Sequence, residues 1–243
     1  RMTGEVIPLD LLPSSRDRVG ITRRFPIGPI AAISPFNFPL NLAAHKLAPA
    51  IATGNSIVLK PPSADPLTML TVAEIVEAAG VPAGSVSILP MTRELGDRMV
   101  ADERFKLLTF TGSPAVGWRM KAGAGKKKVV LELGGNAGVI VDATANIDWA
   151  VKRCLIGAYA YAGQVCISVQ RMFVHETVWD EFMAKFLAGI DTLKLGDPMD
   201  PTTDIGPMAD AEQASRTQRW VDEAVAMGAK HLAGGHADGT FFQ

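Results

Sequence analysis

The sequence has little cysteine and almost no excess charge of either sign. Its 243 residues include only Cys154 and Cys166, and neither belongs to a Cys-x-x-Cys or paired-histidine pattern. The sequence therefore supports neither a disulfide framework nor a zinc site, and we expect no metal and a reducing compartment, the cytoplasm. The formal net charge of -1 gives no electrostatic reason to expect nucleic acid or an anionic membrane surface as a partner.

An uninterrupted apolar helix is also lacking. Residues 25–44 carry no charge over 20 positions, which is the length needed to cross a bilayer. Four prolines, Pro26, Pro29, Pro35 and Pro39, exclude a continuous helix there. The opening Arg-Met-Thr-Gly-Glu resembles neither a signal or transit peptide nor the natural start of a protein. We expect a soluble globular chain without a membrane span.

What the sequence does contain, between residues 27 and 135, is a regular alternation of β-branched apolar runs with helical segments. The clearest helix is Leu67–Ala79, because Asp65 and Pro66 favour its start and Gly80 favours its end. The pattern predicts an α/β fold, a doubly wound parallel sheet of the Rossmann-like kind. The predicted strands are Ile27–Ile33, Ser56–Lys60, Ser85–Leu89, Leu107–Thr111 and Val129–Leu133, and the other predicted helices are Leu40–Ala52, Arg93–Ala101 and one that opens at Ser113-Pro114.

The alternation continues after Gly135, which predicts part of a second α/β domain. Its expected elements are a strand Gly138–Asp142, a helix Ile147–Tyr161, a strand Arg171–His175, and helices Val178–Leu193 and Ala211–Met227. Ahead of the sheet, Gly4–Pro8 and Arg18–Phe25 favour an extended hairpin. We therefore divide the chain into an arm at 1–26, a doubly wound domain at 27–135 and a second domain at 136–243.

Several polar residues follow the predicted strands directly. Asn37 comes after the first strand, Lys60 ends the second, Gly112 and Ser113 follow the fourth, and Glu132 lies at the end of the fifth. The carboxyl ends of parallel strands and the helix N-termini converge at one edge, where ligands bind. Taken singly, Asn37 is typical of a turn and Lys60 of a solvated strand end. Glu132 is harder to explain, because we expect its strand to be buried on both faces, where a carboxylate is costly.

The two cysteines differ in their surroundings. Cys154 falls inside a predicted helix and is typical of a buried packing residue. Cys166 lies in a predicted loop, in Gly163-Gln-Val-Cys166, and is the better candidate for a reactive thiolate. The four histidines are scattered and show no pairing with it. Gly123-Ala-Gly-Lys lacks the spacing of a phosphate-binding P-loop.

Five motifs together resemble the aldehyde dehydrogenase superfamily, in order and in spacing. They are Pro35-Phe-Asn-Phe-Pro39, Ile57-Val-Leu-Lys-Pro61, Phe110-Thr-Gly-Ser113, Leu131-Glu-Leu-Gly-Gly-Asn136 and Gly163-Gln-Val-Cys166. The resemblance implies that 27–135 is part of an NAD(P)-binding domain, that 136–243 is part of a catalytic domain, and that the chain belongs to a longer polypeptide. It also implies that the arm serves a homo-oligomer, a dimer or tetramer.

The resemblance implies a mechanism as well. Cys166 would attack a small aldehyde, and the Asn37 amide and the Cys166 N–H would hold the oxyanion. Hydride loss to NAD or NADP would leave a thioester, and Glu132 would activate the water that hydrolyses it. The residues expected to contact the cofactor are Ser34, Pro35, Phe36, Lys60, Ser63, Phe110, Gly112, Ser113, Leu133 and Gly134.

Two departures from the family pattern carry information. Ser63 stands where many NAD-preferring members have a glutamate, so the carboxylate that would repel a 2′-phosphate is absent and NADP should be tolerated. Asn136 stands where many relatives have lysine. The stretch Ala160–Ser168 is similar to branches acting on small oxygenated or phosphorylated aldehydes.

Three alternatives remain at this stage. The first is a CoA-acylating aldehyde dehydrogenase, although that branch generally lacks the glutamate found here as Glu132. The second is a non-catalytic nucleotide-binding protein, if the natural chain is this short. The third is a cysteine hydrolase, which the lack of a positioned histidine disfavours.

Overall fold

The computed structural model describes residues 4–243, so the first three residues of the predicted arm lie outside the described part. The chain separates into two compact units, Arg1–Glu132 and Leu133–Gln243. The division therefore falls three residues before the boundary drawn from the sequence.

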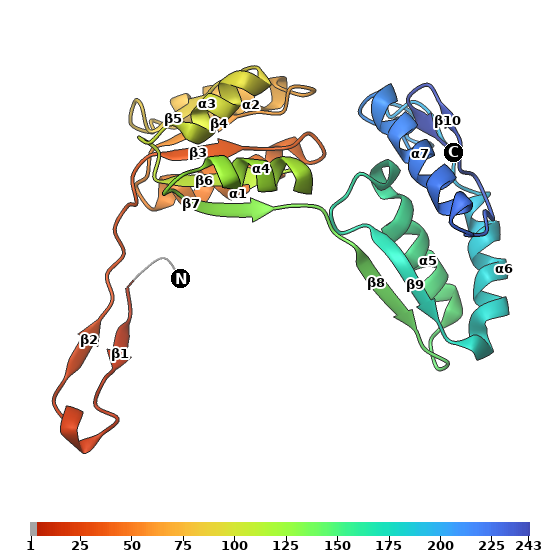
Figure 1. Cartoon of the computed structure of the whole chain (residues 1–243), viewed down its shortest axis with the longest axis horizontal. Coiled ribbons are helices and arrows are strands. Elements are labelled where there is room, and N and C mark those ends of the chain that lie inside the picture. Colours follow the sequence, from red (N-terminus) through yellow and green to blue (C-terminus); the bar gives the residue numbers. More distant parts are fainter. Residues whose placement is uncertain (1–3) are drawn as a thin grey trace. The chain divides into compact units, whose positions relative to one another are not determined.

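The first unit is built on a five-stranded sheet. Its strands β3 (Ile30–Ile33), β4 (Ile57–Lys60), β5 (Val86–Ile88), β6 (Leu107–Thr111) and β7 (Lys128–Glu132) are ordered β5-β4-β3-β6-β7 and are all parallel (Figure 1). The chain runs outward from β3 in one direction and then returns to add β6 and β7 on its other side. The prediction of a doubly wound parallel sheet is confirmed, with strand ends shifted by up to three residues.

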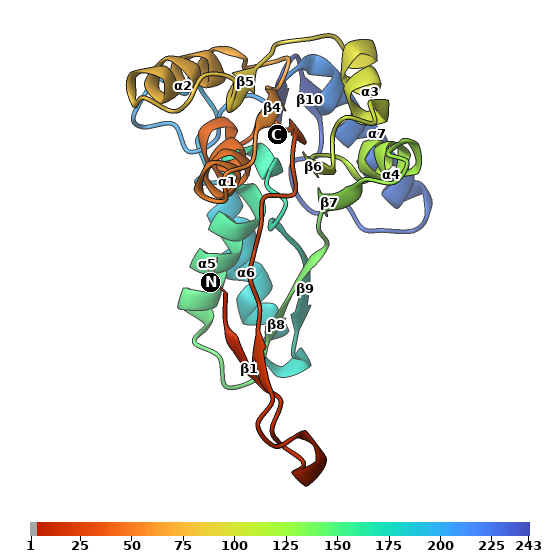
Figure 2. The same ribbon diagram turned by 90° about the vertical axis from the view of Figure 1, so that its left-hand side faces the viewer.

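Four helices connect these strands. They are α1 (Pro39–Ala52), α2 (Leu67–Ala78), α3 (Arg93–Ala101) and α4 (Pro114–Gly123). Figure 2 shows α1 and α2 on one side of the strands and α3 and α4 on the other. The core under α1 and α2 is formed by small and aliphatic side chains that interdigitate: Ile30, Ala32, Ala43, Leu47, Ala50, Ile57, Leu59 and Met69.

One expectation about the sheet is wrong. We expected the strand that carries Glu132 to be buried on both faces, but β7 is an edge strand and Glu132 is exposed. Exposed and half-buried residues alternate along β7, because successive side chains point to opposite faces of the sheet. Burial within this chain therefore gives no argument for the function of Glu132.

The predicted arm contains a short hairpin. Strand β1 (Val6–Pro8) pairs antiparallel with β2 (Val19–Ile21), and a 3₁₀ turn at Pro13–Ser15 lies between them. Its apolar side chains are exposed: Val6 is 70% and Val19 is 74% accessible. A two-stranded hairpin of this size has little stability by itself.

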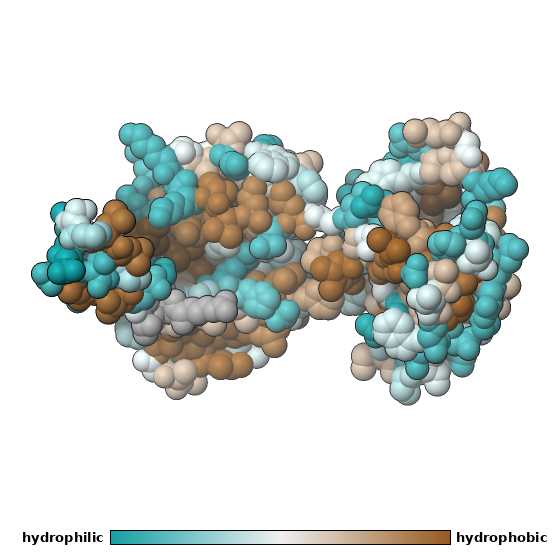
Figure 3. Space-filling model, turned by 90° about the horizontal axis from the view of Figure 1, so that it is seen from below, coloured by the Kyte–Doolittle hydropathy of each residue, from teal (hydrophilic) through white to brown (hydrophobic). Residues whose placement is uncertain are grey.

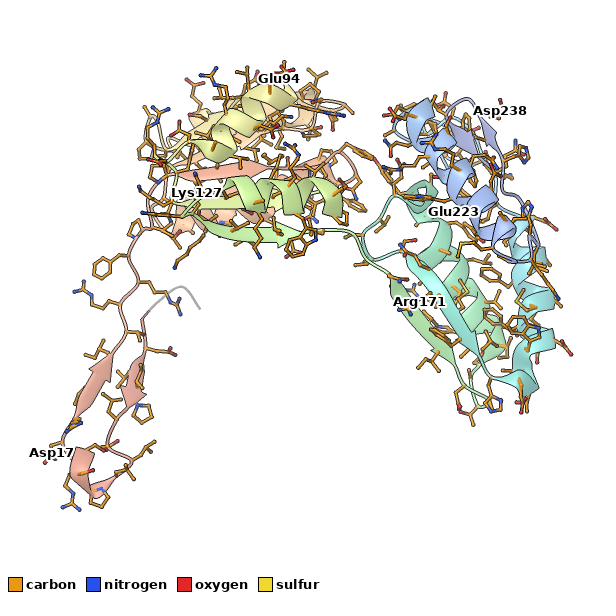
Figure 4. The ribbon with its side chains drawn as sticks, viewed as in Figure 1. Asp17, Glu94, Lys127, Arg171, Glu223 and Asp238 are labelled. Atoms are coloured by element: carbon orange, nitrogen blue, oxygen red, sulfur yellow. The ribbon has the colours of Figure 1, made fainter. Side chains whose placement is uncertain are left out.

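The second unit begins with a parallel pair of strands, β8 (Ala137–Val141) and β9 (Val169–Val174), packed with helices α5 (Ile147–Tyr159) and α6 (Trp179–Ile190). Val141, Cys154 and Phe182 are among the residues buried in its core. The other face of the pair exposes Ile140 and Phe173, and the space-filling view shows apolar surface on both units (Figure 3). Arg171, labelled in Figure 4, lies over the Phe173 ring and donates to the Asn136 carbonyl.

The chain ends in helix α7 (Ala211–Ala226) and a hairpin of β10 (Ala237–Asp238) and β11 (Phe241–Phe242), which pack together. Asp210 caps α7 by accepting a hydrogen bond from the Gln213 N–H at 2.8 Å. Within residues 4–243, no helix has both the length and the apolar character needed to cross a membrane.

Candidate active site

The segment after β3 carries the first group of predicted site residues. Ser34 is buried, and its hydroxyl oxygen has no hydrogen-bond partner within the described part of the chain. Pro35, Phe36 and Asn37 follow it and are half-buried. Because a buried hydroxyl without a partner is unfavourable, Ser34 is suited to meet a polar group of a ligand.

Lys60 ends β4 and is only 8% accessible. Its ammonium donates to the Pro61 carbonyl at 3.2 Å and to the Ser63 hydroxyl at 3.4 Å. Burial lowers the pKa of Lys60, and the nearby charge of Arg93 lowers it further. The predicted pair Lys60 and Ser63 therefore lies together at the strand end.

The turn after β6 is shaped by glycine. A Cβ at Gly112 would lie 2.6 Å from the Phe110 ring, so only glycine fits while that ring keeps its place. Ser113 then precedes α4 with extended backbone and makes no capping hydrogen bond with its side chain. The N–H groups of the first turn of α4 remain available to an anion such as a phosphate.

Glu132, at the end of β7, faces a residue that the sequence analysis did not select. Lys46 of α1 is buried and donates to the hydroxyls of Thr109 at 3.1 Å and Thr111 at 2.7 Å. Burial lowers the pKa of Lys46 to about 8, and the charge of Glu132 acts in the opposite direction. A buried lysine thus shares a face of the sheet with Glu132.

A signal for Lys46 was present in the sequence. Ala43, Lys46, Leu47 and Ala50 are spaced three and four apart, which places the lysine on the apolar face of its helix. An amine on an apolar face requires hydrogen-bond partners in the interior. Those partners, on β6, are sixty residues away in the sequence or more, so only the tertiary structure identifies them.

In the second unit, Cys166 lies in the loop between α5 and β9. Both cysteines are free, and Cys166 is exposed whereas Cys154 is buried. The predicted helix Ile147–Tyr161 ends at Tyr159, because Tyr161 and Ala162 have left-handed backbone, with φ of 57° and 53°. This conformation is uncommon for residues with a side chain and marks a locally strained turn.

The loop is held on both sides of the cysteine. Ser168 is buried and its hydroxyl bonds to the carbonyls of Gly157 at 3.2 Å and Ala158 at 3.1 Å, at the end of α5. On the other side, the Gln164 amide donates to the Tyr161 carbonyl at 3.3 Å and accepts from the Ala209 N–H at 3.1 Å. These bonds fix the backbone that carries the exposed thiol.

The Gly-Gly motif lies against this loop. A Cβ at Gly135 would collide with the carbonyl oxygen of Cys166. Gly135 therefore allows the two backbones to approach as closely as they do, which explains the residue type at that position.

Comparison with known proteins gives the family. The model of the aldehyde dehydrogenase family matches residues 1–243, the whole chain. The chain belongs to the aldehyde dehydrogenase family. It is 43% identical over 243 residues to 3-sulfolactaldehyde dehydrogenase of Priestia aryabhattai, covering 100% of this chain and 51% of that protein. It is 44% identical to lactaldehyde dehydrogenase of Methanocaldococcus jannaschii, covering 98% of this chain and 51% of that protein.

Solved structures agree with this assignment. Aldehyde dehydrogenase 21 from Physcomitrella patens, in complex with the reaction product succinate, superimposes with a TM-score of 0.92 at 49% identity, covering 99% of this chain and 50% of that one. A glyceraldehyde-3-phosphate dehydrogenase from Methanocaldococcus jannaschii, complexed with NADP, gives 0.91 at 43% identity, covering 100% and 53%. This member of the aldehyde dehydrogenase family thus spans about half the length of the relatives it matches.

In this aldehyde dehydrogenase chain, the first unit gathers most of the predicted cofactor-contacting residues at the carboxyl ends of its strands. Leu133 and Gly134 open the second unit, where Leu133 is half-buried and Gly134 is exposed. Within residues 4–243, no cluster of three or more His, Cys, Asp or Glu side chains is arranged to hold a metal ion.

Proposed function

We propose that the full-length protein oxidises a small aldehyde to a carboxylate with NAD(P)⁺, and that Cys166 is its nucleophile. The observation that carries this proposal is the exposed, free thiol of Cys166 in a loop tethered on both sides, within a chain of the aldehyde dehydrogenase family. A fixed backbone favours a nucleophile because it limits the thiol to the few orientations that reach a bound substrate.

In the first step, the Cys166 thiolate forms a bond to the aldehyde carbon, and the carbonyl oxygen becomes an oxyanion. The Asn37 side-chain amide and the Cys166 N–H would donate hydrogen bonds to that oxygen. Asn37 is suited to this role because it is half-buried directly after β3 and just before α1.

In the second half of the reaction, the Glu132 carboxylate would take a proton from a water molecule. Loss of hydride from the substrate carbon to NAD(P)⁺ converts the first adduct into a thioester. The hydroxide then attacks the thioester carbon, the carbon–sulfur bond breaks, and the Cys166 thiolate is regenerated. Glu132 is exposed at the end of β7 and so is accessible to water.

The residues of the first unit fit a dinucleotide cofactor. The unpartnered hydroxyl of Ser34, the uncapped N-terminus of α4 at Ser113, and the Lys60–Ser63 pair offer groups for hydroxyls and phosphates. Pro35, Phe36, Phe110, Gly112, Leu133 and Gly134 would complete the contacts. When bound, NAD(P)⁺ supplies the acceptor for the hydride that leaves the substrate carbon.

The substrate class we propose is a short aldehyde that carries oxygen or an anionic group. The names of the relatives support this, since they include 3-sulfolactaldehyde, lactaldehyde and glyceraldehyde-3-phosphate dehydrogenases. All three of these aldehydes are three-carbon compounds with a hydroxyl group.

The test compares Cys166→Ala with Cys154→Ala in the full-length protein. NAD(P)H formation from a panel of short aldehydes should vanish in Cys166→Ala and persist in Cys154→Ala, whose thiol lies in the core of the second unit. Turnover by Cys166→Ala would contradict the assignment of the nucleophile. Faster turnover with CoA than with water as acceptor would instead place the protein in the CoA-acylating branch.

We also propose that the protein acts in the cytoplasm as a homo-oligomer through the arm. The exposed apolar side chains of the β1–β2 hairpin need a surface to cover them. Sedimentation of the full-length protein with and without residues 1–26 tests this, and an unchanged oligomeric state would contradict it.

A further inference from the structure

Helix α5 ends where its own sequence favours continuation. The residues that follow Tyr159 are Ala160, Tyr161 and Ala162, and alanine has the highest helix propensity of all residue types. A glycine, which commonly ends a helix, comes only at Gly163. The backbone nevertheless leaves the helix at Ala160, with ψ of 135°, and turns left-handed at the next two residues. A contact from another part of the chain is needed to explain this early end.

The Ser168 hydroxyl supplies that contact. In a continued α-helix, each N–H donates to the carbonyl four residues earlier. The carbonyls of Gly157 and Ala158 would then accept from the N–H groups of Tyr161 and Ala162. The Ser168 hydroxyl bonds to these same two carbonyls, at 3.2 Å and 3.1 Å, and Ser168 is only 5% accessible. Ser168 therefore ends α5 from across the Cys166 loop.

Close packing brings the hydroxyl to this place. Strand β9 begins at Val169, directly after Ser168, and packs against α5 (Figure 1). A Cβ on Gly157 would lie 2.7 Å from a methyl carbon of Val169, so the helix and the start of the strand touch through a glycine. This close approach explains why a serine one residue before the strand reaches the last carbonyls of the helix.

Cys166 lies inside the loop that this contact closes. The chain enters the loop through the left-handed turn and leaves it at Ser168, two residues after the thiol. The turn is costly, because φ of 57° and 53° at Tyr161 and Ala162 is disfavoured for residues with a Cβ atom. Its Tyr161 carbonyl accepts from the Gln164 N–H at 3.1 Å and from the Gln164 side-chain amide at 3.3 Å. Extension of α5 through residues 160–162 would remove this turn and change the path of the chain to Cys166.

We propose that Ser168 is a positioning residue for Cys166. Its hydroxyl satisfies the last carbonyls of α5 and so keeps Tyr161 and Ala162 in the left-handed turn that directs the thiol loop. The competing arrangement is α5 extended by about one turn, in which the same carbonyls accept from backbone N–H groups. The inference rests on the proposed function, in which Cys166 is the nucleophile, and deepens it by naming the group that sets the position of the nucleophile.

The experiment compares Ser168→Ala with a double variant that combines Ser168→Ala and Ala162→Gly, in the full-length protein. Without the hydroxyl, the carbonyls regain partners when the helix extends, so kcat should fall about tenfold while KM for the aldehyde stays within about twofold. Glycine at position 162 adopts left-handed backbone without strain and disfavours a helix, so it should restore most of the lost kcat. A serine that acted only through packing would show no such rescue.

Ala162→Val tests the same turn with Ser168 intact, so the inference stays testable if Ser168→Ala does not fold. A β-branched residue rarely adopts positive φ, and kcat should fall at least about tenfold. Thr192→Ala is the matched control, because the exposed Thr192 hydroxyl bonds at 2.8 Å to the Gly189 carbonyl at the end of α6, in the same unit. This variant should keep kcat within about twofold.

Alkylation of Cys166 by iodoacetamide at a fixed pH gives a second readout that does not depend on turnover. Its rate should change in Ser168→Ala and return toward the wild-type value in the double variant. Wild-type kcat in Ser168→Ala or in Ala162→Val, or an equal loss of kcat with and without Ala162→Gly, would overturn the role of Ser168 and leave the proposed function standing. Turnover by Cys166→Ala would instead overturn the proposed function, and the alkylation rates would then decide whether Ser168 positions the thiol.

Discussion

The backbone of Gly135 lies directly against the carbonyl of Cys166, with no room for a Cβ atom between them. Two motifs separated by thirty residues are thereby fixed to each other within one unit. The exposed thiol is therefore held by this contact as well as by the hydrogen bonds of its own loop.

Gly135→Ala should therefore impair catalysis. The new methyl group meets backbone, which cannot rotate away, so the Cys166 loop must move; a displacement of about 1 Å costs roughly a hundredfold in rate. The measurement is kcat with a short aldehyde in the full-length protein. Gly138→Ala is the control, because its nearest neighbour there is a ring atom of Phe173 at 3.6 Å. Equal rates in the two variants would show that the contact is not needed.

Gln164 should act as a positioning residue for Cys166. Gln164→Ala removes the bonds to Tyr161 and Ala209, so we expect kcat to fall about tenfold, with a change in the free energy of unfolding of no more than about 1 kcal/mol. The rate at which iodoacetamide alkylates Cys166 at a fixed pH should change as well. Gln170→Ala, an exposed residue of β9, is the control, and an unchanged alkylation rate in Gln164→Ala would argue against positioning.

Gly112→Ala should destabilise the first unit. Its methyl group would lie 2.6 Å from the Phe110 ring, and we expect a loss of about 1–3 kcal/mol in the free energy of unfolding. Gly123→Ala, in the last turn of α4 with nothing within 4 Å, should be neutral or stabilising by up to about 1 kcal/mol. Urea denaturation of both variants gives the comparison. Similar values for the two would mean that the ring moves aside freely.

Lys46 should make stability depend on pH. Its pKa is lowered from 10.5 to about 8 in the folded chain. Between these two values the unfolded chain holds a proton that the folded chain has released, so the free energy of unfolding rises with pH, by up to about 3 kcal/mol. Below about pH 8 Lys46 is protonated in both the folded and the unfolded chain, so it causes no change of the free energy of unfolding with pH there.

Lys46→Met isolates this effect, since other lysines titrate in the same range. The difference in free energy of unfolding between wild type and variant, measured by urea denaturation, should shift in favour of the wild type as the pH rises from about 8 to about 10.5. A constant difference across this range would mean that Lys46 is not desolvated.

The order of strands and helices was readable from the sequence because it depends on local patterns. Arg93–Ala101 and Leu107–Thr111 were predicted with the boundaries that the structure has, since capping residues and apolar alternation specify them within a few positions. The predicted helix Ile147–Tyr161 was too long by two residues, since α5 ends at Tyr159. The backbone turns left-handed at Tyr161 and Ala162, and neither tyrosine nor alanine is a residue type that predicts such a turn.

Residue types at the strand ends were equally readable. The sequence by itself determined which side chains, such as Asn37, Lys60 and Glu132, follow or end parallel strands, because their chain positions relative to each strand are local facts. It also determined that residue 63 is an uncharged serine, which does not repel a phosphate as a carboxylate would.

Only the tertiary structure decided what surrounds those side chains. Strand order makes β7 an edge and leaves Glu132 exposed, helix packing buries Lys46 between two threonines of β6, and α3 brings Arg93 to Lys60. Each of these facts joins residues that are distant in the sequence. Burial, charge proximity and close backbone approach depend on which elements pack together, and no local pattern encodes that.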